Sequence, residues 1–376
     1  MNVAIIYHQF PHYRAPVMRE LALRGHHDYV FYGSEKDFDG IKAFKGDEAV
    51  AVSFLDVSRT KRGFRFKNYV HIATDKSTEV LVILGNPNIF ATWVLAILGR
   101  MNGKKVVFWA HGWLAQESLS KRWLRRMYYQ LSHSLLVYGD RSKAIGVSQG
   151  YNPDRVRVVY NSLDYETSTR VFEHIESGAD GDVSCARQLF SDPLRPLIIC
   201  TARLTELCRF DVLLQAAEQL RHMGHEVNVL LVGDGPSRHE LEQLALQLEL
   251  SVHFYGACYD EAVLGRLIYY ADATVSPGKI GLTAIHSLSY GTPAFTHGDM
   301  DRQMPEVEAI TPGVTGDFFC RNSVDDLALV LKRWFESGND RAQVRRACRS
   351  TISQRWNPAK QRELIESALD SIRWGA

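Results

Sequence analysis

The chain has 376 residues, 45% of them hydrophobic, which is more apolar material than one core usually organises and therefore predicts two domains. Its 44 basic and 43 acidic residues nearly cancel, which argues against a nucleic-acid-binding protein whose whole surface is positive. No apolar run reaches about 18 residues, so we expect any membrane contact to be peripheral.

The six cysteines form no CxxC pair, which indicates neither a zinc site nor a disulfide framework and favours reduced thiols. The first residues lead directly into a β-branched run, without a basic leader followed by an apolar stretch. We therefore expect a cytoplasmic protein, placed at the inner face of the membrane if it contacts lipid.

Strand and helix patterns alternate along the N-terminal half of the chain, as in a doubly wound sheet. A first domain is predicted over residues 1–165, with a helix from about Ala15 to Leu23. The expected strands are Val3–Tyr7, Tyr29–Tyr32, Val80–Leu84, Lys105–Trp109, Leu135–Tyr138 and Val156–Tyr160.

Polar side chains follow several of these strands, at the edge where open α/β sheets bind ligands. His12, Tyr13 and Arg14 lie in the loop after the first strand, Asn86 follows the third and His111 follows the fourth. A lone histidine is more often a structural hydrogen-bonding residue. The sequence HGW directly after a strand nevertheless favours a functional role for His111.

Two basic and aromatic segments, residues 59–67 and 121–129, interrupt this pattern. A helix over the second segment would separate its arginines from its apolar side chains, which suits the surface of an anionic bilayer. A solvated helix face is the alternative interpretation. The arginines are Arg122, Arg125 and Arg126, and the apolar residues are Trp123, Met127 and Leu131.

Residues 166–195 contain no expected strand, and the stretch 176–182 is polar with two glycines, so this span is the expected linker. A second α/β domain is predicted over residues 196–356. Its expected strands are Leu197–Thr201, Val227–Val232, Val252–Tyr255, Ala273–Val275 and the short run Ala294–Phe295.

Three loops of the second domain combine features that suit a phosphate group. The loop after the first strand carries Arg203 and Arg209. The turn GDGP (233–236) has two glycines that would let the backbone approach a ligand closely, although such turns also occur without a ligand. The turn 276–278 should begin a helix and leave backbone N–H groups for an anion.

The segments ARL (202–204), VGDGP (232–236) and SPGKIGLTAIHSLSYGTPAF (276–295), in this order and spacing, resemble the retaining nucleotide-sugar glycosyltransferases of family 4. The resemblance covers nearly the whole chain. It implies the GT-B fold, an α/β architecture of two doubly wound Rossmann-like domains facing across a cleft. The first domain would bind the acceptor and the second the sugar nucleotide, and a C-terminal helix over about 357–376 would cross back to the first domain.

The resemblance and the positions at strand ends together identify candidate site residues. The catalytic candidates are His111, Arg203 and Arg209. The donor-binding candidates are Gly233, Asp234, Gly235, Ser276, Gly278, Lys279, Ile280, Gly281, Leu282 and His286. The acceptor-binding candidates are His12, Tyr13, Arg14 and Asn86.

The chain departs from the family pattern at two places. The family's two glutamates, which hold the sugar hydroxyls and the ribose, correspond to Gly278 and His286. We expect the N–H group of Gly278 and an imidazole nitrogen of His286 to replace them. The lysine that the family places against the diphosphate corresponds to Cys208, with Arg209 beside it as a substitute.

The resemblance implies transfer of a sugar from a nucleoside diphosphate to a glycan or lipid-linked acceptor, with retention of anomeric configuration, in surface polysaccharide synthesis. Cations and backbone N–H groups would stabilise the leaving diphosphate, so we expect neither a cofactor nor a metal ion. Two alternatives are a sugar-nucleotide epimerase, which needs no acceptor, and a non-catalytic sugar-nucleotide-binding module, which the missing glutamates and lysine would suit.

Overall fold

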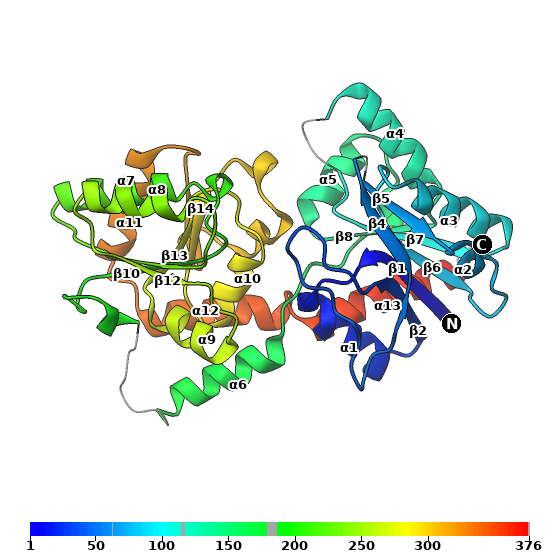
Figure 1. The fold of residues 1–376 in the computed structure, drawn as a ribbon, viewed down its shortest axis with the longest axis horizontal. Coiled ribbons are helices and arrows are strands. Elements are labelled where there is room, and N and C mark those ends of the chain that lie inside the picture. The colour runs from blue at the N-terminus through cyan, green and yellow to red at the C-terminus, as the bar shows by residue number, and fades with distance from the viewer. Residues whose placement is uncertain (62, 114–116, 179–185, 375–376) are drawn as a thin grey trace. The chain divides into compact units, whose positions relative to one another are not determined.

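The computed structural model describes residues 1–61, 63–113, 117–178 and 186–374. The chain forms two compact units (Figure 1). Unit 1 comprises Met1–Leu163 with Asn357–Ala376, and unit 2 comprises Asp164–Trp356. Each unit is built on a parallel sheet with helices on its faces, which confirms the prediction of two doubly wound α/β domains.

Unit 1 contains a seven-stranded sheet in the order β3-β2-β1-β6-β7-β8-β9, in which every neighbouring pair is parallel. The strand order reverses between β1 and β6. The strands are β1 (Asn2–Gln9), β2 (Asp28–Ser34), β3 (Val52–Phe54), β6 (Val80–Leu84), β7 (Lys105–Ala110), β8 (Ser134–Val137) and β9 (Val156–Val158). A separate antiparallel hairpin pairs β4 (Asp56–Thr60) with β5 (Gly63–Lys67).

Alternate side chains of the central strands enter two apolar layers of unit 1. Val3 and Ile5 of β1 pack with side chains from α1 and α13, whereas Ala4 and Ile6 pack with side chains from α3 and α4 on the other face. A strand buried on both faces has this two-residue period. The helices are α1 (Ala15–Arg24), α2 (Val70–Thr74), α3 (Phe90–Met101), α4 (Leu119–Gln130), α5 (Asp140–Ser148) and α13 (Pro358–Trp374).

Unit 2 contains a six-stranded parallel sheet in the order β12-β11-β10-β13-β14-β15, which reverses between β10 and β13. Helices α7 and α11 cover one face and α9 covers the other (Figure 1). The strands are β10 (Leu197–Thr201), β11 (Asn228–Val232), β12 (Val252–Gly256), β13 (Ala273–Ser276), β14 (Ala294–His297) and β15 (Gly316–Phe319). The helices are α6 (Tyr165–Glu176), α7 (Phe210–His222), α8 (Arg238–Gln247), α9 (Glu261–Tyr270), α10 (Leu282–Ser289), α11 (Val324–Glu336) and α12 (Arg341–Gln354).

Every expected strand is present, with ends within two residues of those predicted, whereas β3, β15 and the β4–β5 hairpin were missed. The helix that was expected to begin at the turn 276–278 begins only at Leu282. The prediction was wrong because the turn continues to Gly281, held by a hydrogen bond from the Ile280 N–H to the side chain of Gln303.

The span expected to be a linker, residues 166–195, begins with a helix, α6, which ends at Glu176. Helix α6 belongs to unit 2, where Phe172 contacts the ring of Tyr269 on α9. Residues 179–182 of the polar stretch and Cys185 lie outside the described residues. The C-terminal helix α13 belongs to unit 1 and packs there through Ile365 and Leu369.

Candidate functional site

The carboxyl ends of β10 and β13 in unit 2 meet where the strand order reverses, which is where doubly wound sheets bind ligands. Two hydrogen bonds join the loops that follow these strands. The Gly278 N–H donates to the carbonyl of Cys208 at 3.0 Å, and the Thr283 hydroxyl donates to the carbonyl of Thr201 at 3.3 Å. The two loops therefore form one continuous surface at this edge.

Glycines make this close packing of loops feasible. A Cβ on Gly233, whose φ is 152°, would lie 1.9 Å from the carbonyl oxygen of Ala202. A Cβ on Gly235 would lie 2.2 Å from the carbonyl oxygen of Leu204. These distances are too short for any side chain, so both glycines are needed for contact between neighbouring loops. Contact between the loops is therefore enough to explain both glycines, without the expected close approach of a ligand to this turn.

The predicted role of Gly278 is wrong, because its N–H group already donates to Cys208. A Cβ at this position would also lie 2.1 Å from the carbonyl oxygen of Leu207. The absence of the family's glutamate therefore has a packing reason in this chain, since no side chain fits between the two loops.

Two cationic side chains on this surface are available to a ligand. Arg203 follows β10 and Lys279 lies in the turn after β13, and both are exposed. Neither side chain forms an ion pair or hydrogen bond with the residues that the structure describes. Because the two loops are joined, both cations belong to the same edge of unit 2.

The N-terminus of α10 adds hydrogen-bond donors to this edge. The backbone N–H groups of Gly281, Leu282 and Thr283 have no acceptor within the described part of the chain. Unpaired N–H groups and the positive end of the helix dipole both favour an anion. Arg203, Lys279 and a helix N-terminus thus lie together at this edge.

Arg209 differs from the expected substitute for the family's lysine. Its guanidinium donates to the carboxylate of Asp211 at 2.9 and 3.0 Å and to Asn322 at 2.7 Å. The thiol of Cys208 donates to the carbonyl of Arg203 at 3.2 Å. The charge of Arg209 is therefore already paired with Asp211, and its role as a substitute for the family's lysine stays a prediction.

His286 lies beside a carboxylate that the sequence reasoning missed. Its Nε2 is 3.0 Å from Glu261 Oε1, and the hydroxyl of Tyr290 donates to the same oxygen at 2.6 Å. Burial acts to raise the pKa of Glu261, but the hydrogen bonds from His286 and Tyr290 outweigh it and lower that pKa. Glu261 comes from α9, so only the folded chain reveals this pairing.

Three further donor-binding candidates have side chains that are used within the protein. The Ser276 hydroxyl donates to the carbonyl of Lys279, and Asp234 Oδ1 accepts from the N–H of Gly235. The side chain of Ile280 is buried in an apolar cluster. These residues shape the turns, while Leu282 and His286 remain partly exposed on one face of α10.

The corresponding edge of unit 1 brings His111 and Arg14 into one aromatic environment. The rings of His111 and Tyr138 are 5.1 Å apart between centroids. The guanidinium carbon of Arg14 lies 4.7 to 5.4 Å from the ring centres of Tyr7, Trp109 and Tyr138. These rings hold Arg14 in place by cation–π contacts.

His111 and His8 are both neutral at physiological pH. Desolvation by the surrounding protein and the charge of Arg14 lower the pKa of His111 to about 4, although the residue is exposed to solvent. The same two causes lower the pKa of His8 to about 4. His8 Nδ1 and Trp109 Nε1 are buried and have no hydrogen-bond partner among the described residues. Both are candidates for contact with a ligand hydroxyl, and the sequence analysis did not select either.

The other acceptor-binding candidates are less well placed for binding. His12 is exposed, and its ring contacts that of Tyr13 edge to face, with 5.6 Å between centroids. The side-chain oxygen of Asn86 accepts from the N–H of Asn88 and so closes its own turn. The side-chain oxygen of Asn86 is therefore already used within the protein.

Helix α4 forms as predicted, but its arginines do not share one solvent-facing side. Arg125 points inward, where it pairs with Glu117 and donates to the carbonyl of Gly112 at 2.8 Å. Its predicted contact with a membrane is therefore wrong. The outward side carries Trp123 and Met127, whose exposed fractions are 65% and 45%. Within the described residues, no helix combines the length and apolar content that a membrane span requires.

Residues 186–351 match the family described as Glycosyl transferases group 1. A GDP-mannose-dependent alpha-(1-6)-phosphatidylinositol dimannoside mannosyltransferase of Mycobacterium tuberculosis (strain ATCC 25177 / H37Ra) is 32% identical over 138 residues, which are 35% of this chain and 34% of that protein. A glycogen synthase of Leptothrix cholodnii is 29% identical over 168 residues, which are 42% of this chain and 34% of that protein. The chain thus spans about a third of the length of these relatives.

The fold is shared with a solved structure of Alr3699/HepE from Anabaena in complex with UDP. Its TM-score is 0.74 over 99% of this chain and 100% of that chain, at 15% sequence identity. This likeness identifies the fold as GT-B, with two Rossmann-like domains. The family match lies entirely within unit 2 and includes the β10/β13 edge.

Proposed function

We propose that this chain, which carries a match to the group 1 glycosyl transferases, moves a sugar from a nucleoside-diphosphate donor to a glycan or lipid-linked acceptor. The observation that carries the proposal is the edge of unit 2 at β10 and β13, where Arg203, Lys279 and the N-terminus of α10 lie together. A nucleoside diphosphate needs both cations and N–H donors.

In the proposed donor site, the planar guanidinium of Arg203 donates hydrogen bonds to two phosphate oxygens, and Lys279 supplies the second cation. The N–H groups of Leu282 and Thr283 donate to the phosphate nearer the helix. As the bond between sugar and phosphate breaks, charge grows on the diphosphate, and these groups stabilise it without a metal ion.

The ribose or sugar hydroxyls are proposed to contact the pair formed by His286 and Glu261. The family's glutamate is absent at position 286, but Glu261 places a carboxylate 3.0 Å from the imidazole that stands there. A carboxylate and an imidazole nitrogen are suitable hydrogen-bonding partners for vicinal hydroxyls. This pair supports binding of a sugar nucleotide despite the missing glutamate.

The acceptor is proposed to bind at the edge of unit 1 that holds His8, Arg14 and His111. Stacked aromatic rings and buried nitrogens without partners suit the apolar faces and hydroxyls of a sugar ring. His111, with its pKa near 4, is a neutral hydrogen-bonding group under physiological conditions. It is positioned to orient the reacting hydroxyl or sugar.

Transfer is proposed to retain the anomeric configuration. Neither a carboxylate nor another nucleophile was identified from the sequence at the position where it could attack the sugar. The acceptor hydroxyl instead forms its bond to the anomeric carbon on the face from which the diphosphate leaves, and its proton passes to a departing phosphate oxygen. Synthesis of a surface polysaccharide or glycolipid is the proposed role.

The test is a product analysis with UDP-sugars and GDP-sugars, each with and without an extract of glycans and glycolipids. We expect nucleoside diphosphate to be released only when an acceptor is present, and the product to keep the donor's anomeric configuration by NMR. Conversion of the donor without any acceptor would identify an epimerase. Binding without turnover across donors and acceptors would favour a binding module.

A further inference from the structure

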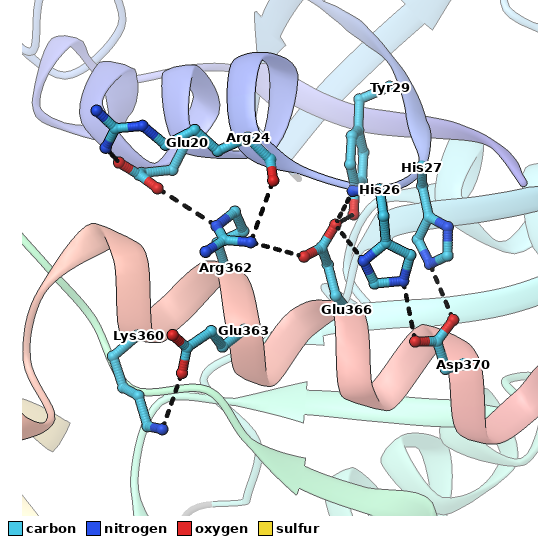
Figure 2. Close-up of polar contacts among 10 residues, drawn as sticks. All are labelled: Glu20, Arg24, His26, His27, Tyr29, Lys360, Arg362, Glu363, Glu366 and Asp370. Atoms are coloured by element: carbon cyan, nitrogen blue, oxygen red, sulfur yellow. Dashed lines mark hydrogen bonds and ion pairs between the residues drawn. The ribbon is translucent and has the colours of Figure 1, made fainter.

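Two adjacent histidines and a carboxylate come together at the junction of β2 and α13 in unit 1 (Figure 2). His26 Nε2 lies 3.0 Å from Asp370 Oδ2, and His27 Nε2 lies 3.3 Å from Asp370 Oδ1. One ligand atom from each of the three residues lies within 4.8 Å of the others.

His27 is the buried member of this cluster. Its side chain is 1% exposed, and Nε2 has no hydrogen-bond partner among the described residues, although Asp370 is close. The amino group of Met1 lies 3.5 Å from Nδ1, which leaves Nε2 for a ligand.

The spacing of these groups fits a tetrahedral metal ion. Two ligands at about 2.0 to 2.2 Å from zinc are roughly 3.3 to 3.6 Å apart at the tetrahedral angle. His26 Nε2 lies 3.0 Å from Asp370 Oδ2 and His27 Nε2 lies 3.3 Å from Asp370 Oδ1, and one ligand atom from each of the three residues lies within 4.8 Å of the others. Neutral imidazole and carboxylate ligands favour zinc over magnesium or calcium, which prefer oxygen alone.

A second set of groups orients the outer histidine. Glu366 Oε1 lies 3.3 Å from His26 Nδ1 and accepts the His26 backbone N–H at 2.7 Å. The other carboxylate oxygen of Glu366 accepts from Arg362 at 3.1 Å. Figure 2 shows both contacts on the same side of α13. A carboxylate that holds the second nitrogen of a histidine is the usual support for a metal ligand.

We propose that His26 Nε2, His27 Nε2 and the Asp370 carboxylate bind one Zn²⁺ ion, with water completing the coordination. The ion joins the segment that enters β2 to the C-terminal helix α13. All three ligands of the ion belong to unit 1, and the ion is proposed to act within that unit. Its effect is to hold α13 on the sheet.

The experiment uses the full chain without a polyhistidine tag, freed of metal by chelation and titrated with zinc chloride in a calorimeter. We expect one ion per chain. At about 100 times the dissociation constant, zinc should raise the melting temperature by about 5 °C or more, whereas magnesium should have no effect. Cobalt(II) should give the visible absorption of a four-coordinate site, a readout that requires no variant.

Two variants with partly exposed side chains test the ligands. His26→Gln and Asp370→Asn should each weaken zinc binding at least about tenfold. His239→Gln, at an exposed histidine on α8 in unit 2, is the matched control and should bind zinc as the wild type does. Failure of the wild type to bind one zinc ion, or equal zinc affinity in all three variants, would overturn the proposal. A melting temperature that responds to pH but not to zinc would also overturn it and leave an ion-pair cluster.

Discussion

Two arginines in the loop after β10 differ in what surrounds their charge. Arg203 is exposed without an ion pair among the described residues, whereas Arg209 is held by Asp211 and Asn322. A guanidinium without a protein partner can give its full hydrogen-bonding capacity to a ligand, while one that is already paired must first break those bonds.

The first prediction follows from this difference. Arg203→Ala should lower kcat/KM by about a hundredfold or more, because it removes stabilisation of the leaving diphosphate. Arg209→Ala should lower it less than about tenfold, and Arg333→Ala, at an exposed position in the last turn of α11, should leave it unchanged. Steady-state kinetics measures all three. Equal losses for Arg203→Ala and Arg209→Ala would mean that the paired arginine reaches the phosphate.

The second prediction concerns His111. Its substitution by Ala should lower turnover by about a hundredfold if it contributes in the transition state, with little change in melting temperature. Because the pKa of His111 is about 4, its loss should not shift the pH profile of turnover above pH 6. Normal kinetics in a stable His111→Ala protein would remove this residue from the acceptor site.

The third prediction uses a histidine that accepts a backbone hydrogen bond. Val106 N–H donates to His133 Nδ1 at 2.9 Å, and desolvation with nearby Arg100 and Lys105 lowers the pKa of His133 to about 4. The unfolded chain therefore binds a proton more readily between about pH 6.5 and 4. The stability that the neutral imidazole contributes is present above this window and is lost as pH falls through it.

His133→Asn keeps a hydrogen-bond acceptor near Val106 but does not titrate. From pH 7 to pH 5 the wild type should lose more stability than this variant, by on the order of 1 kcal/mol. Denaturant unfolding at both pH values measures the difference, and the exposed His239→Gln serves as the control. An identical pH response in His133→Asn and the wild type would contradict the assignment.

At the level of secondary structure, the apolar strands were predictable because each is a short β-branched run followed by a turn. The hairpin β4–β5 was not, because its alternation of cations with Phe64 and Phe66 suggested a basic surface. In the structure, Phe66 is buried and Phe64 stacks on His8 with 4.2 Å between ring centroids. Whether such a segment forms a hairpin depends on cross-strand pairing and burial, and neither of these can be read from its composition.

The loops of unit 2 show a second feature that could not be predicted from the sequence. A glycine is compatible both with close approach of a ligand and with close approach of another loop, and the residue type does not distinguish them. For Gly233 and Gly278 the nearest neighbours are protein carbonyls. The cations were found because a charged residue after a strand has few structural uses, whereas Glu261 was missed because tertiary packing alone brings it to His286.

The fourth prediction concerns the outward side of α4. Trp123 and Met127 are exposed there, and the exposed Arg126 lies one turn of the helix from Trp123, which suits the interface of an anionic membrane. Trp123→Ser should reduce sedimentation with anionic liposomes several-fold, and salt should weaken the binding. Leu246→Ser, at an apolar residue of α8 that is also exposed, is the control. If wild-type protein does not sediment with these liposomes, α4 is a solvated helix face.

At the level of the whole molecule, two units with the same strand order carry different chemistry at their carboxyl edges. Unit 2 presents cations and helix N–H groups at the β10/β13 reversal, whereas unit 1 presents neutral histidines among aromatic rings. The doubly wound class of both sheets was predicted from the alternation of strand and helix patterns, whereas the strand orders come from the structure. The proposed binding of the donor by unit 2 and of the acceptor by unit 1 depends on side chains that only the fold brings together.

The most direct test of this account is hydrogen exchange of the full chain with saturating UDP or GDP, compared with the protein alone. The account predicts slower exchange in residues 202–209 and 276–286 for whichever nucleotide binds, since the phosphates would engage these loops and the first N–H groups of α10. Arg203→Ala should abolish that protection at the same nucleotide concentration. Saturable nucleotide binding that leaves these two segments unprotected would contradict the central claim, because the donor would then bind elsewhere.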